Sequence, residues 1–251
     1  MLKVDGLTVA VGGKIILRDI NFEINAGETH ILFGPNGSGK STLLGTLMGF
    51  ERFEIVDGHI YFQGEEITHL PVHERAQRGI GLMFQRPPTI KGLPMHHMIK
   101  ICARGRKVSE DLTKKLKFDK FMDRDVNYGF SGGEMKRSEI LQLLAQDPDL
   151  ILLDEPESGV DIENIALIGD SINMLLERNV SPEDVKPMYR QRRERKKAGL
   201  IITHTGHILN YVHADFGHVI FEGRMSCHGN PRELFDCIQR MGYGECVRCA
   251  I

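Results

Sequence analysis

The chain has 251 residues, with 32 lysines and arginines against 34 aspartates and glutamates and a formal net charge of −2. This length allows one large α/β domain with an attached lobe, and the balanced charge gives no support for a nucleic-acid binder or a membrane-surface protein. The sequence has no apolar run long enough to span a membrane and no signal-peptide pattern at its start, so we expect a cytoplasmic protein without direct membrane insertion.

The first part of the chain alternates apolar and polar side chains. Residues 2–33 follow this pattern, with interruptions at Gly6, Gly12-Gly13 and Ala26-Gly27. The pattern predicts several short antiparallel strands, which would form an N-terminal β subdomain. The last apolar run, 29–33, leads directly into a glycine-rich loop.

That loop fits the P-loop pattern of Gly, four residues, Gly-Lys-Ser/Thr. It consists of Gly34, Pro35, Asn36, Gly37, Ser38, Gly39, Lys40, Ser41 and Thr42. The glycines let successive backbone N–H groups face inward, and the helix that follows adds the positive end of its dipole, so a phosphate can be cradled. Lys40 would reach the β- and γ-phosphates, Ser41 would bind Mg²⁺, and Thr42 would hold the α/β-phosphates. A glycine-rich turn that binds nothing is the alternative, and the complete pattern after a strand argues against it.

A helix should run from Ser41 to about Met48, followed by a strand pair near 58–64 and a helix over 72–78. The apolar strand 79–85 then ends in Gln85. Residues 86–129 are rich in Lys, Arg, Asp and Met, with helix-like spacing over 95–104 and 109–122, which predicts a small helical lobe.

Polar side chains end two further buried strands. After Ser131-Gly132-Gly133-Glu134, a helix should run over 135–145, and the apolar run 150–154 is typical of a parallel strand buried on both faces. This strand ends in Asp154 and Glu155. A helix over 164–178 precedes the strand 200–204, which ends in His204. Since ligands bind at the carboxyl ends of parallel strands, these polar residues should share one edge of the sheet.

Five stretches stand in the order of the ABC-type ATPases: the P-loop at 34–42, Gln85, residues 131–134, residues 153–161 and His204. The sequence resembles that family over almost the whole chain, as one domain over 1–251. The resemblance implies an α/β fold with a P-loop NTPase core, a mixed, mainly parallel sheet flanked by helices, an N-terminal antiparallel β subdomain and a small helical lobe.

The resemblance also implies the catalytic roles, with ATP and Mg²⁺ as cofactors. Gln85 would sense Mg²⁺ and the attacking water, and Asp154 would hold Mg²⁺ through water. Glu155 would be the general base or the water-positioning group. His204 would contact the γ-phosphate and help fix Glu155. As a hypothesis, Lys136 pairs with Glu155 in the resting state and keeps it idle.

Self-association follows from the same resemblance. Ser131, Gly132 and Gly133 would form a second anion site that serves the nucleotide of a partner monomer, with Asp161 also part of nucleotide binding. Two ATP molecules would then be sandwiched between two copies, and a lone monomer should hydrolyse ATP slowly. Val11 stands where many such proteins place an aromatic residue, which puts adenine selectivity in question.

Within the ABC ATPases, the sequence resembles the SufC family of the SUF iron–sulfur cluster assembly system more than it resembles transporter subunits. The similar stretches are 50–58, 84–92, 126–134, 158–163 and 241–244, whereas Pro156 is the transporter-like form. This resemblance implies a soluble SufB/SufD-like scaffold as partner. The alternatives are the cytosolic subunit of a membrane transporter and a non-catalytic ATP-binding module, and Glu155 and His204 argue against the latter.

Two segments have no assigned role. The basic insertion 179–198 is either a solvated helical insertion or a docking site for an acidic partner, and it lacks the interleaved aromatics of a nucleic-acid binder. The C-terminal tail, 240–251, contains Cys246 and Cys249 in a Cys-x-x-Cys pattern. These cysteines are either metal or cluster ligands, a dithiol, or incidental. Five scattered cysteines do not suggest a disulfide framework.

Overall fold

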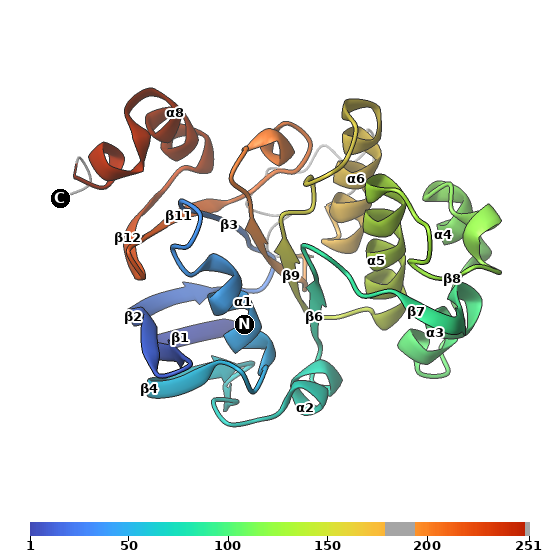
Figure 1. Cartoon of the computed structure of the whole chain (residues 1–251), viewed down its shortest axis with the longest axis horizontal. Coiled ribbons are helices and arrows are strands. Elements are labelled where there is room, and N and C mark those ends of the chain that lie inside the picture. Colours follow the sequence, from blue (N-terminus) through green and yellow to red (C-terminus); the bar gives the residue numbers. More distant parts are fainter. Residues whose placement is uncertain (179–193, 249–251) are drawn as a thin grey trace.

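The computed structural model describes residues 1–178 and 194–248 and contains two main sheets with helices packed around them (Figure 1). The antiparallel sheet has the strand order β2-β1-β4-β5. Its strands are β1 (Leu2–Val11), β2 (Lys14–Ile24), β4 (Glu54–Phe62) and β5 (Glu65–Glu66). The predicted short N-terminal strands are therefore two long ones. Gly6, with φ +59°, lies at a register shift of β1, so it makes a bulge and does not end the strand.

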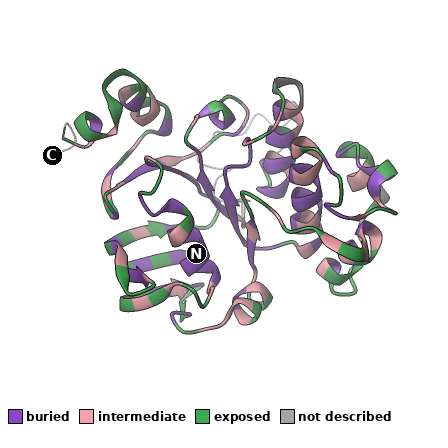
Figure 2. Cartoon of the chain, in the orientation of Figure 1, coloured by how far each residue is buried: buried purple, intermediate pink, exposed green. Residues whose placement is uncertain are grey.

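The central sheet has six strands in the order β12-β11-β3-β10-β9-β6, and only β12 runs antiparallel to its neighbour. Its strands are β3 (Thr29–Phe33), β6 (Ile80–Met83), β9 (Leu150–Asp154), β10 (Ala198–Ile202), β11 (Phe216–Phe221) and β12 (Arg224–Gly229). Three central strands of this sheet, β3, β9 and β10, are buried along their whole length (Figure 2). The mainly parallel sheet was predicted from the apolar runs, and this prediction is confirmed.

Successive residues of the central strands point to opposite faces of the sheet and belong to two separate hydrophobic cores. Ile31 and Phe33 of β3 pack with the helices α5 (Gly132–Gln146), α6 (Ile162–Leu175) and α8 (Pro231–Arg248). Leu32, which points the other way, joins Leu43 and Leu47 of α1 (Lys40–Met48) and the inner face of the antiparallel sheet. Helix α1, which follows the P-loop, is therefore enclosed between the two sheets.

The end of α1 is fixed by a buried guanidinium. Arg75, on α2 (Val72–Gln77), is 1% exposed and donates to the carbonyl oxygens of Thr46 and Leu47 at 2.8 and 2.9 Å. It also donates to the carbonyls of Leu70 and Thr68, each at 2.8 Å. Burial lowers its pKa to about 10, which leaves it charged at neutral pH. A cation at this position stabilises the negative end of the α1 dipole.

The lobe contains α3 (Met95–Ala103), α4 (Glu110–Lys115) and the short 3₁₀ turn Asp119–Phe121. The predicted helix over 109–122 is split because Lys117 adopts φ +50° and the buried Phe118 and Phe121 follow. The sequence did not predict the pairing of β7 (Ile90–Pro94) with β8 (Asp125–Val126), which closes the base of the lobe.

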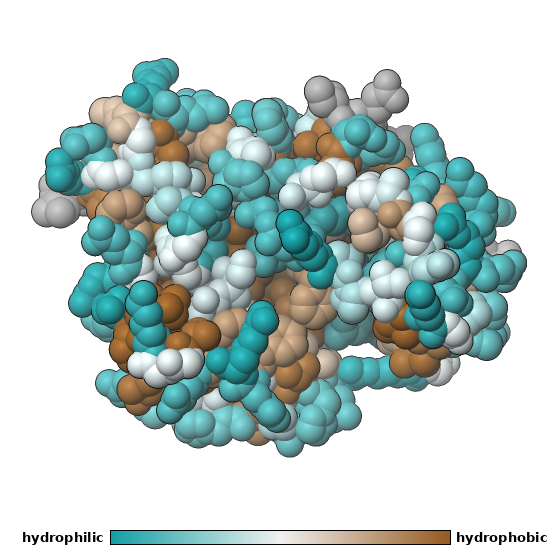
Figure 3. Space-filling view, in the orientation of Figure 1, coloured by the Kyte–Doolittle hydropathy of each residue, from teal (hydrophilic) through white to brown (hydrophobic). Residues whose placement is uncertain are grey.

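The surface carries no single extended apolar face in the view of Figure 3, where polar side chains surround several small apolar patches. In the described ranges, the large exposed apolar side chains are Val56, Phe84, Ile101, Tyr128 and Met241. None of the helices in these ranges is long and apolar enough to cross a membrane.

Candidate nucleotide-hydrolysis site

The P-loop surrounds the side chain of its own lysine, Lys40. Gly37 and Gly39 adopt φ of +79° and +105°, and a Cβ at Gly39 would lie 2.5 Å from a methyl carbon of Leu17, so only glycine fits there. Lys40 Nζ donates to the carbonyls of Gly34 and Pro35 at 2.8 and 2.9 Å. Burial lowers the pKa of Lys40, while Glu155 and Asp154 oppose that shift. The lysine is thus held inside a loop whose amides precede the N-terminus of α1.

A cavity of about 520 Å³ opens over this loop. Its lining combines the P-loop with side chains from both sheets: Val11, Ile16, Asn36, Gly37, Gly39, Lys40, Ser41, Thr42, Phe53, Gln85 and Glu155. The lining combines the charged and polar groups of the P-loop, Gln85 and Glu155 with the apolar side chains of Val11, Ile16 and Phe53, against which a ring can pack. The arrangement fits a nucleotide with its phosphates on the loop.

Asp154 has the environment of a cation ligand. It lies at the end of β9, is 9% exposed, and its Oδ1 has no hydrogen-bond partner. Burial raises the pKa of Asp154, a hydrogen bond from Ser41 lowers it, and Glu155 raises it further. A hard cation would satisfy the unpaired oxygen and compensate the crowded negative charge. Asp154 and Ser41 therefore fit Mg²⁺, whose preferred ligands are oxygens.

Three of the residues predicted from the sequence, Gln85, Glu155 and His204, are joined through the carboxylate of Glu155. Glu155 Oε2 accepts a hydrogen bond from Gln85 Nε2 at 2.6 Å, and Glu155 Oε1 lies 3.1 Å from His204 Nδ1. The three residues follow β6, β9 and β10, which are adjacent in the parallel part of the sheet. Glu155 adopts φ +48°, an unusual conformation for a residue with a side chain and one that is typical of functional sites.

Ser131, Gly132 and Gly133 lie outside the P-loop cavity of their own chain, since none of them lines it. They begin α5, where Ser131 Oγ accepts from the Glu134 amide at 3.4 Å and Glu134 Oε2 accepts from the Ser131 amide at 2.8 Å. A Cβ at Gly132 would lie 2.0 Å from the Gly159 carbonyl oxygen, so this segment packs tightly against residues 158–161, which end at Asp161, the N-cap of α6.

Comparisons with known proteins show the family to which this chain belongs. Residues 17–158 match the protein family described as ABC transporter. The chain is 34% identical to the "probable ATP-dependent transporter SufC" of Escherichia coli (strain K12), over 97% of this chain and 98% of that protein. The chain belongs to the ABC ATPase family. This confirms the predicted family and fold class.

Further relatives and structures support the assignment. A "probable ATP-dependent transporter" of Synechocystis sp. is 35% identical over 97% of this chain and 94% of its own length. Among solved structures, a nucleotide-free ATP-binding cassette from an ABC transporter has a TM-score of 0.75 and 25% identity, and the match covers 98% of each chain. An ABC transporter cassette in its ADP conformation has a TM-score of 0.73 and 26% identity, over 98% of this chain and 97% of its own.

The predicted pairing of Lys136 with Glu155 is wrong for this state of the ABC ATPase. Lys136 Nζ donates to the carbonyls of Phe84 and Gln85 at 3.2 and 3.0 Å. Both oxygens of Glu155 are already engaged, by Gln85 and His204. Burial lowers the pKa of Lys136, although several carboxylates oppose the shift, with Glu139 the largest.

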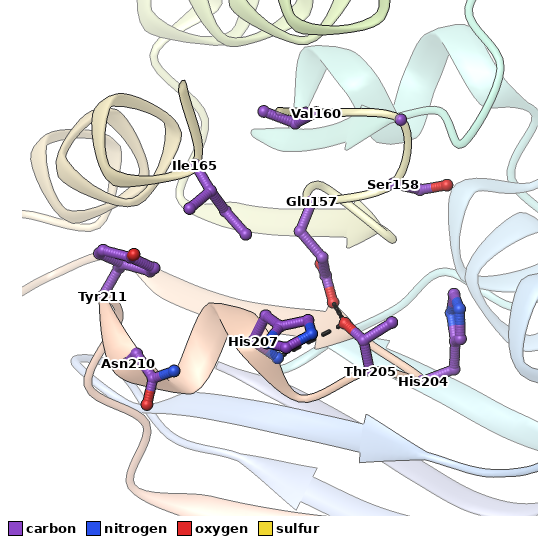
Figure 4. Close-up of a pocket in the computed structure, with 10 residues that line it drawn as sticks. Glu157, Ser158, Val160, Ile165, His204, Thr205, His207, Asn210 and Tyr211 are labelled. Atoms are coloured by element: carbon purple, nitrogen blue, oxygen red, sulfur yellow. Dashed lines mark hydrogen bonds between the residues drawn. The ribbon is translucent and has the colours of Figure 1, made fainter. Parts of the chain in front are cut away.

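Glu157 is a site residue that the sequence analysis missed. Its Oε1 accepts hydrogen bonds from the hydroxyls of Thr203 and Thr205, the two neighbours of His204 in the chain. The bond from Thr205, at 3.0 Å, is drawn in Figure 4. Its Oε2 is buried without a partner. A second cavity of about 490 Å³, beside the segment 158–160, is lined in part by Glu157, His204 and Thr205. No spacing in the sequence signals this contact, because it joins residues 46 and 48 positions apart.

Phe53 was also missed, and it bears on adenine recognition. Its ring lines the P-loop cavity together with Val11, and the guanidinium carbon of Arg52 lies 4.6 Å from the ring centroid. The ring packs so closely on α1 that a Cβ at Gly45 would lie 2.0 Å from it. The cavity therefore has an aromatic side chain even though Val11 replaces the usual one.

The C-terminal cysteines do not form a recognisable metal centre in the described part of the chain. Cys246 lies in α8 and is 3% exposed, next to Cys227 and Cys237 in the same core. Burial raises its pKa to about 12, so it is a protonated thiol at neutral pH. Among residues 1–178 and 194–248, no group of three or more His, Cys, Asp or Glu side chains is arranged to hold a metal. Cys249 and residues 179–193 of the basic insertion lie outside the described ranges.

Proposed function

We propose that this chain hydrolyses ATP to ADP and phosphate with Mg²⁺. One observation carries the proposal: Glu155 stands at the edge of the P-loop cavity with one oxygen bound to Gln85 and the other beside His204. A carboxylate held in this way is oriented toward the position that a γ-phosphate would occupy on Lys40. The P-loop and Lys40 bind and orient the phosphates, and Asp154 and Ser41 hold the cation.

In this mechanism Glu155 accepts a proton from the attacking water, or orients that water for in-line attack. Gln85 holds one carboxylate oxygen and His204 the other, which fixes the orientation of Glu155 at the wall of the cavity. Mg²⁺ supplies charge neutralisation on the phosphate oxygens when bound. His204 also serves as a donor to the γ-phosphate, and Glu157 holds its neighbours in place.

The active site we propose is composite and forms when two copies enclose two ATP molecules. Support comes from the position of Ser131, Gly132 and Gly133, which stand at a helix N-terminus away from their own P-loop cavity. The N-terminus of α5 can bind an anion, and the phosphates of a nucleotide bound to a second copy would supply that anion. Asp161, at the exposed start of α6, lies on the same side as Gly159, which contacts Gly132.

The work driven by hydrolysis would be a conformational change in a soluble iron–sulfur cluster assembly scaffold of the SufB/SufD type. Support comes from the SufC-like stretches of the sequence and from relatives that include a protein named SufC. The second candidate is the ATP-binding subunit of a membrane transporter. The relatives' names, which include the words "ATP-dependent transporter", favour that candidate.

The first experiment measures ATP hydrolysis by the purified chain with Mg²⁺, alone and with its Glu155→Gln variant. We expect a slow rate in the wild type, a rate at least about 100-fold lower in the variant, and an ATP-dependent dimer of the variant in light scattering. Glu54→Gln, an exposed residue of β4, is the matched control and should behave as the wild type. A wild type that hydrolyses ATP no faster than Glu155→Gln under all conditions would contradict the proposal.

The partner is tested by affinity capture of the tagged chain from the soluble extract and, separately, from detergent-solubilised membranes of its native cells. Recovery of a soluble scaffold that stimulates ATP hydrolysis supports the cluster-assembly role. Recovery of a polytopic membrane protein instead would make the chain a transporter subunit. Both outcomes leave the hydrolysis proposal intact, because the same residues serve either partner.

A further inference from the structure

Helix α5 carries two buried ionisable side chains that the proposed chemistry does not use. Lys136 is 2% exposed and Glu139 is 7% exposed, and they lie one helical turn apart. Burying charged groups is costly unless each finds hydrogen-bond partners. Both therefore call for a structural or functional reason.

Both side chains bind the same short piece of backbone. Glu139 Oε2 accepts a hydrogen bond from the Phe84 amide at 3.1 Å. Lys136 Nζ donates to the Phe84 carbonyl at 3.2 Å and to the Gln85 carbonyl at 3.0 Å. One amide and two carbonyls of consecutive residues are thus held by a single helix, just beyond the point where the pairing of β6 with β9 ends at Met83.

We propose that Lys136 and Glu139 form a clamp that positions Gln85 against Glu155. The inference rests on the proposed ATP hydrolysis. Gln85 Nε2 reaches Glu155 Oε2 at 2.6 Å, so the orientation of Glu155 depends on where the Gln85 backbone is held. Lys136 and Glu139 are positioning residues, since neither lines the P-loop cavity.

The clamp also links two parts of the site. Helix α5 begins at Ser131, Gly132 and Gly133, the residues proposed to bind the nucleotide of a second copy. A shift of α5 when that nucleotide binds would move Phe84 and Gln85 through the clamp, and with them the bond to Glu155. The charge-assisted hydrogen bonds of Lys136 suit this task because they are stronger than bonds between neutral groups. Displacing a reacting group by about 1 Å can cost about 100-fold in rate.

The key variant is the double replacement Lys136→Met/Glu139→Met. It removes both buried ionisable groups together, so no unpaired buried charge remains, and the flexible methionine side chains occupy a similar volume. We expect kcat for ATP hydrolysis to fall about 30- to 100-fold. The KM for ATP, and the dissociation constant of a fluorescent ATP analogue measured with Mg²⁺ chelated, should stay within about threefold because the P-loop is untouched.

Two further variants separate positioning from packing. Glu139→Gln keeps an oxygen that can accept the Phe84 amide, and we expect it to keep kcat within about fivefold of the wild type. Gln142→Ala, one turn further along α5, is the matched control. Its side chain bonds only Ser138 of its own helix, at 3.2 and 3.3 Å, and the wild-type rate is expected.

A folded double variant with wild-type kcat would overturn the clamp, and so would a loss of ATP affinity in proportion to kcat. A measurement on the unmodified protein stands independently of any variant. The Phe84 amide should exchange with deuterium as slowly as the amides of β6, and rapid exchange at Phe84 would also overturn the proposal. If the wild type itself hydrolyses no ATP, the proposed function fails instead, and the exchange measurement still tests the clamp contacts.

Discussion

A buried histidine pair makes the stability of this protein depend strongly on pH. His30 on β3 and His218 on β11 lie with Nδ1 and Nε2 2.8 Å apart, and His30 Nε2 lies 3.0 Å from Glu28 Oε2. His30 therefore has a polar partner at each of its two ring nitrogens. Burial lowers the pKa of His30 to about 4 and that of His218 to about 3, so both are neutral in the folded protein.

The size of the effect follows from the pKa differences. In the unfolded chain both imidazoles should titrate near 6.5, so below that pH the unfolded state binds more protons than the folded state. The two histidines therefore leave the free energy of unfolding unchanged above about pH 6.5. They lower it as the pH drops toward the pKa values of the folded protein. One pKa unit corresponds to about 1.4 kcal/mol, so at about pH 5 each histidine removes about 2 kcal/mol and the pair about 4 kcal/mol.

The test is urea unfolding at about pH 7.5 and about pH 5 for the wild type and His30→Gln/His218→Gln. Between these pH values the wild type should lose about 4 kcal/mol more than the double variant. His59→Gln is the control, because this exposed imidazole has its pKa raised by a hydrogen bond to Glu66 and should not share the effect. If the double variant loses as much stability as the wild type, these histidines are not responsible.

Three other predictions concern single side chains. Arg75→Met should lower the free energy of unfolding by about 3–5 kcal/mol, because four backbone carbonyls, three of them in buried contacts, lose a hydrogen bond. A loss below about 1 kcal/mol in urea unfolding would contradict this. Phe53→Ala should raise the KM for ATP about five- to tenfold at constant kcat, because it removes an aromatic ring from the P-loop cavity. An unchanged KM would exclude a role for Phe53 in binding the adenine. Glu157→Ala should lower kcat about tenfold by freeing the segment around His204, whereas Glu157→Gln, which keeps an oxygen for Thr205, should retain most of the rate. Equal rates for the two Glu157 variants would refute the positioning role.

Local patterns determined much of the site. The glycines and Lys40 of the P-loop, the apolar run that ends in Asp154 and Glu155, and the strand that ends near His204 are recognisable because each depends on neighbours within a few residues. A strand buried on both faces has to be apolar throughout and can be polar only where it ends. The sequence alone therefore places the candidate site residues at the ends of strands.

The tertiary structure decided which of these ends meet and which partner each charge takes. The strand order brings Gln85, Glu155 and His204 together across neighbouring strands, although 70 residues separate Gln85 from Glu155. Lys136 binds the backbone of residues 84 and 85 in place of Glu155, and His30 meets His218 across 188 residues. Such contacts depend on how helices and strands pack to bury both faces of the central sheet, a non-local condition that no short stretch of sequence encodes.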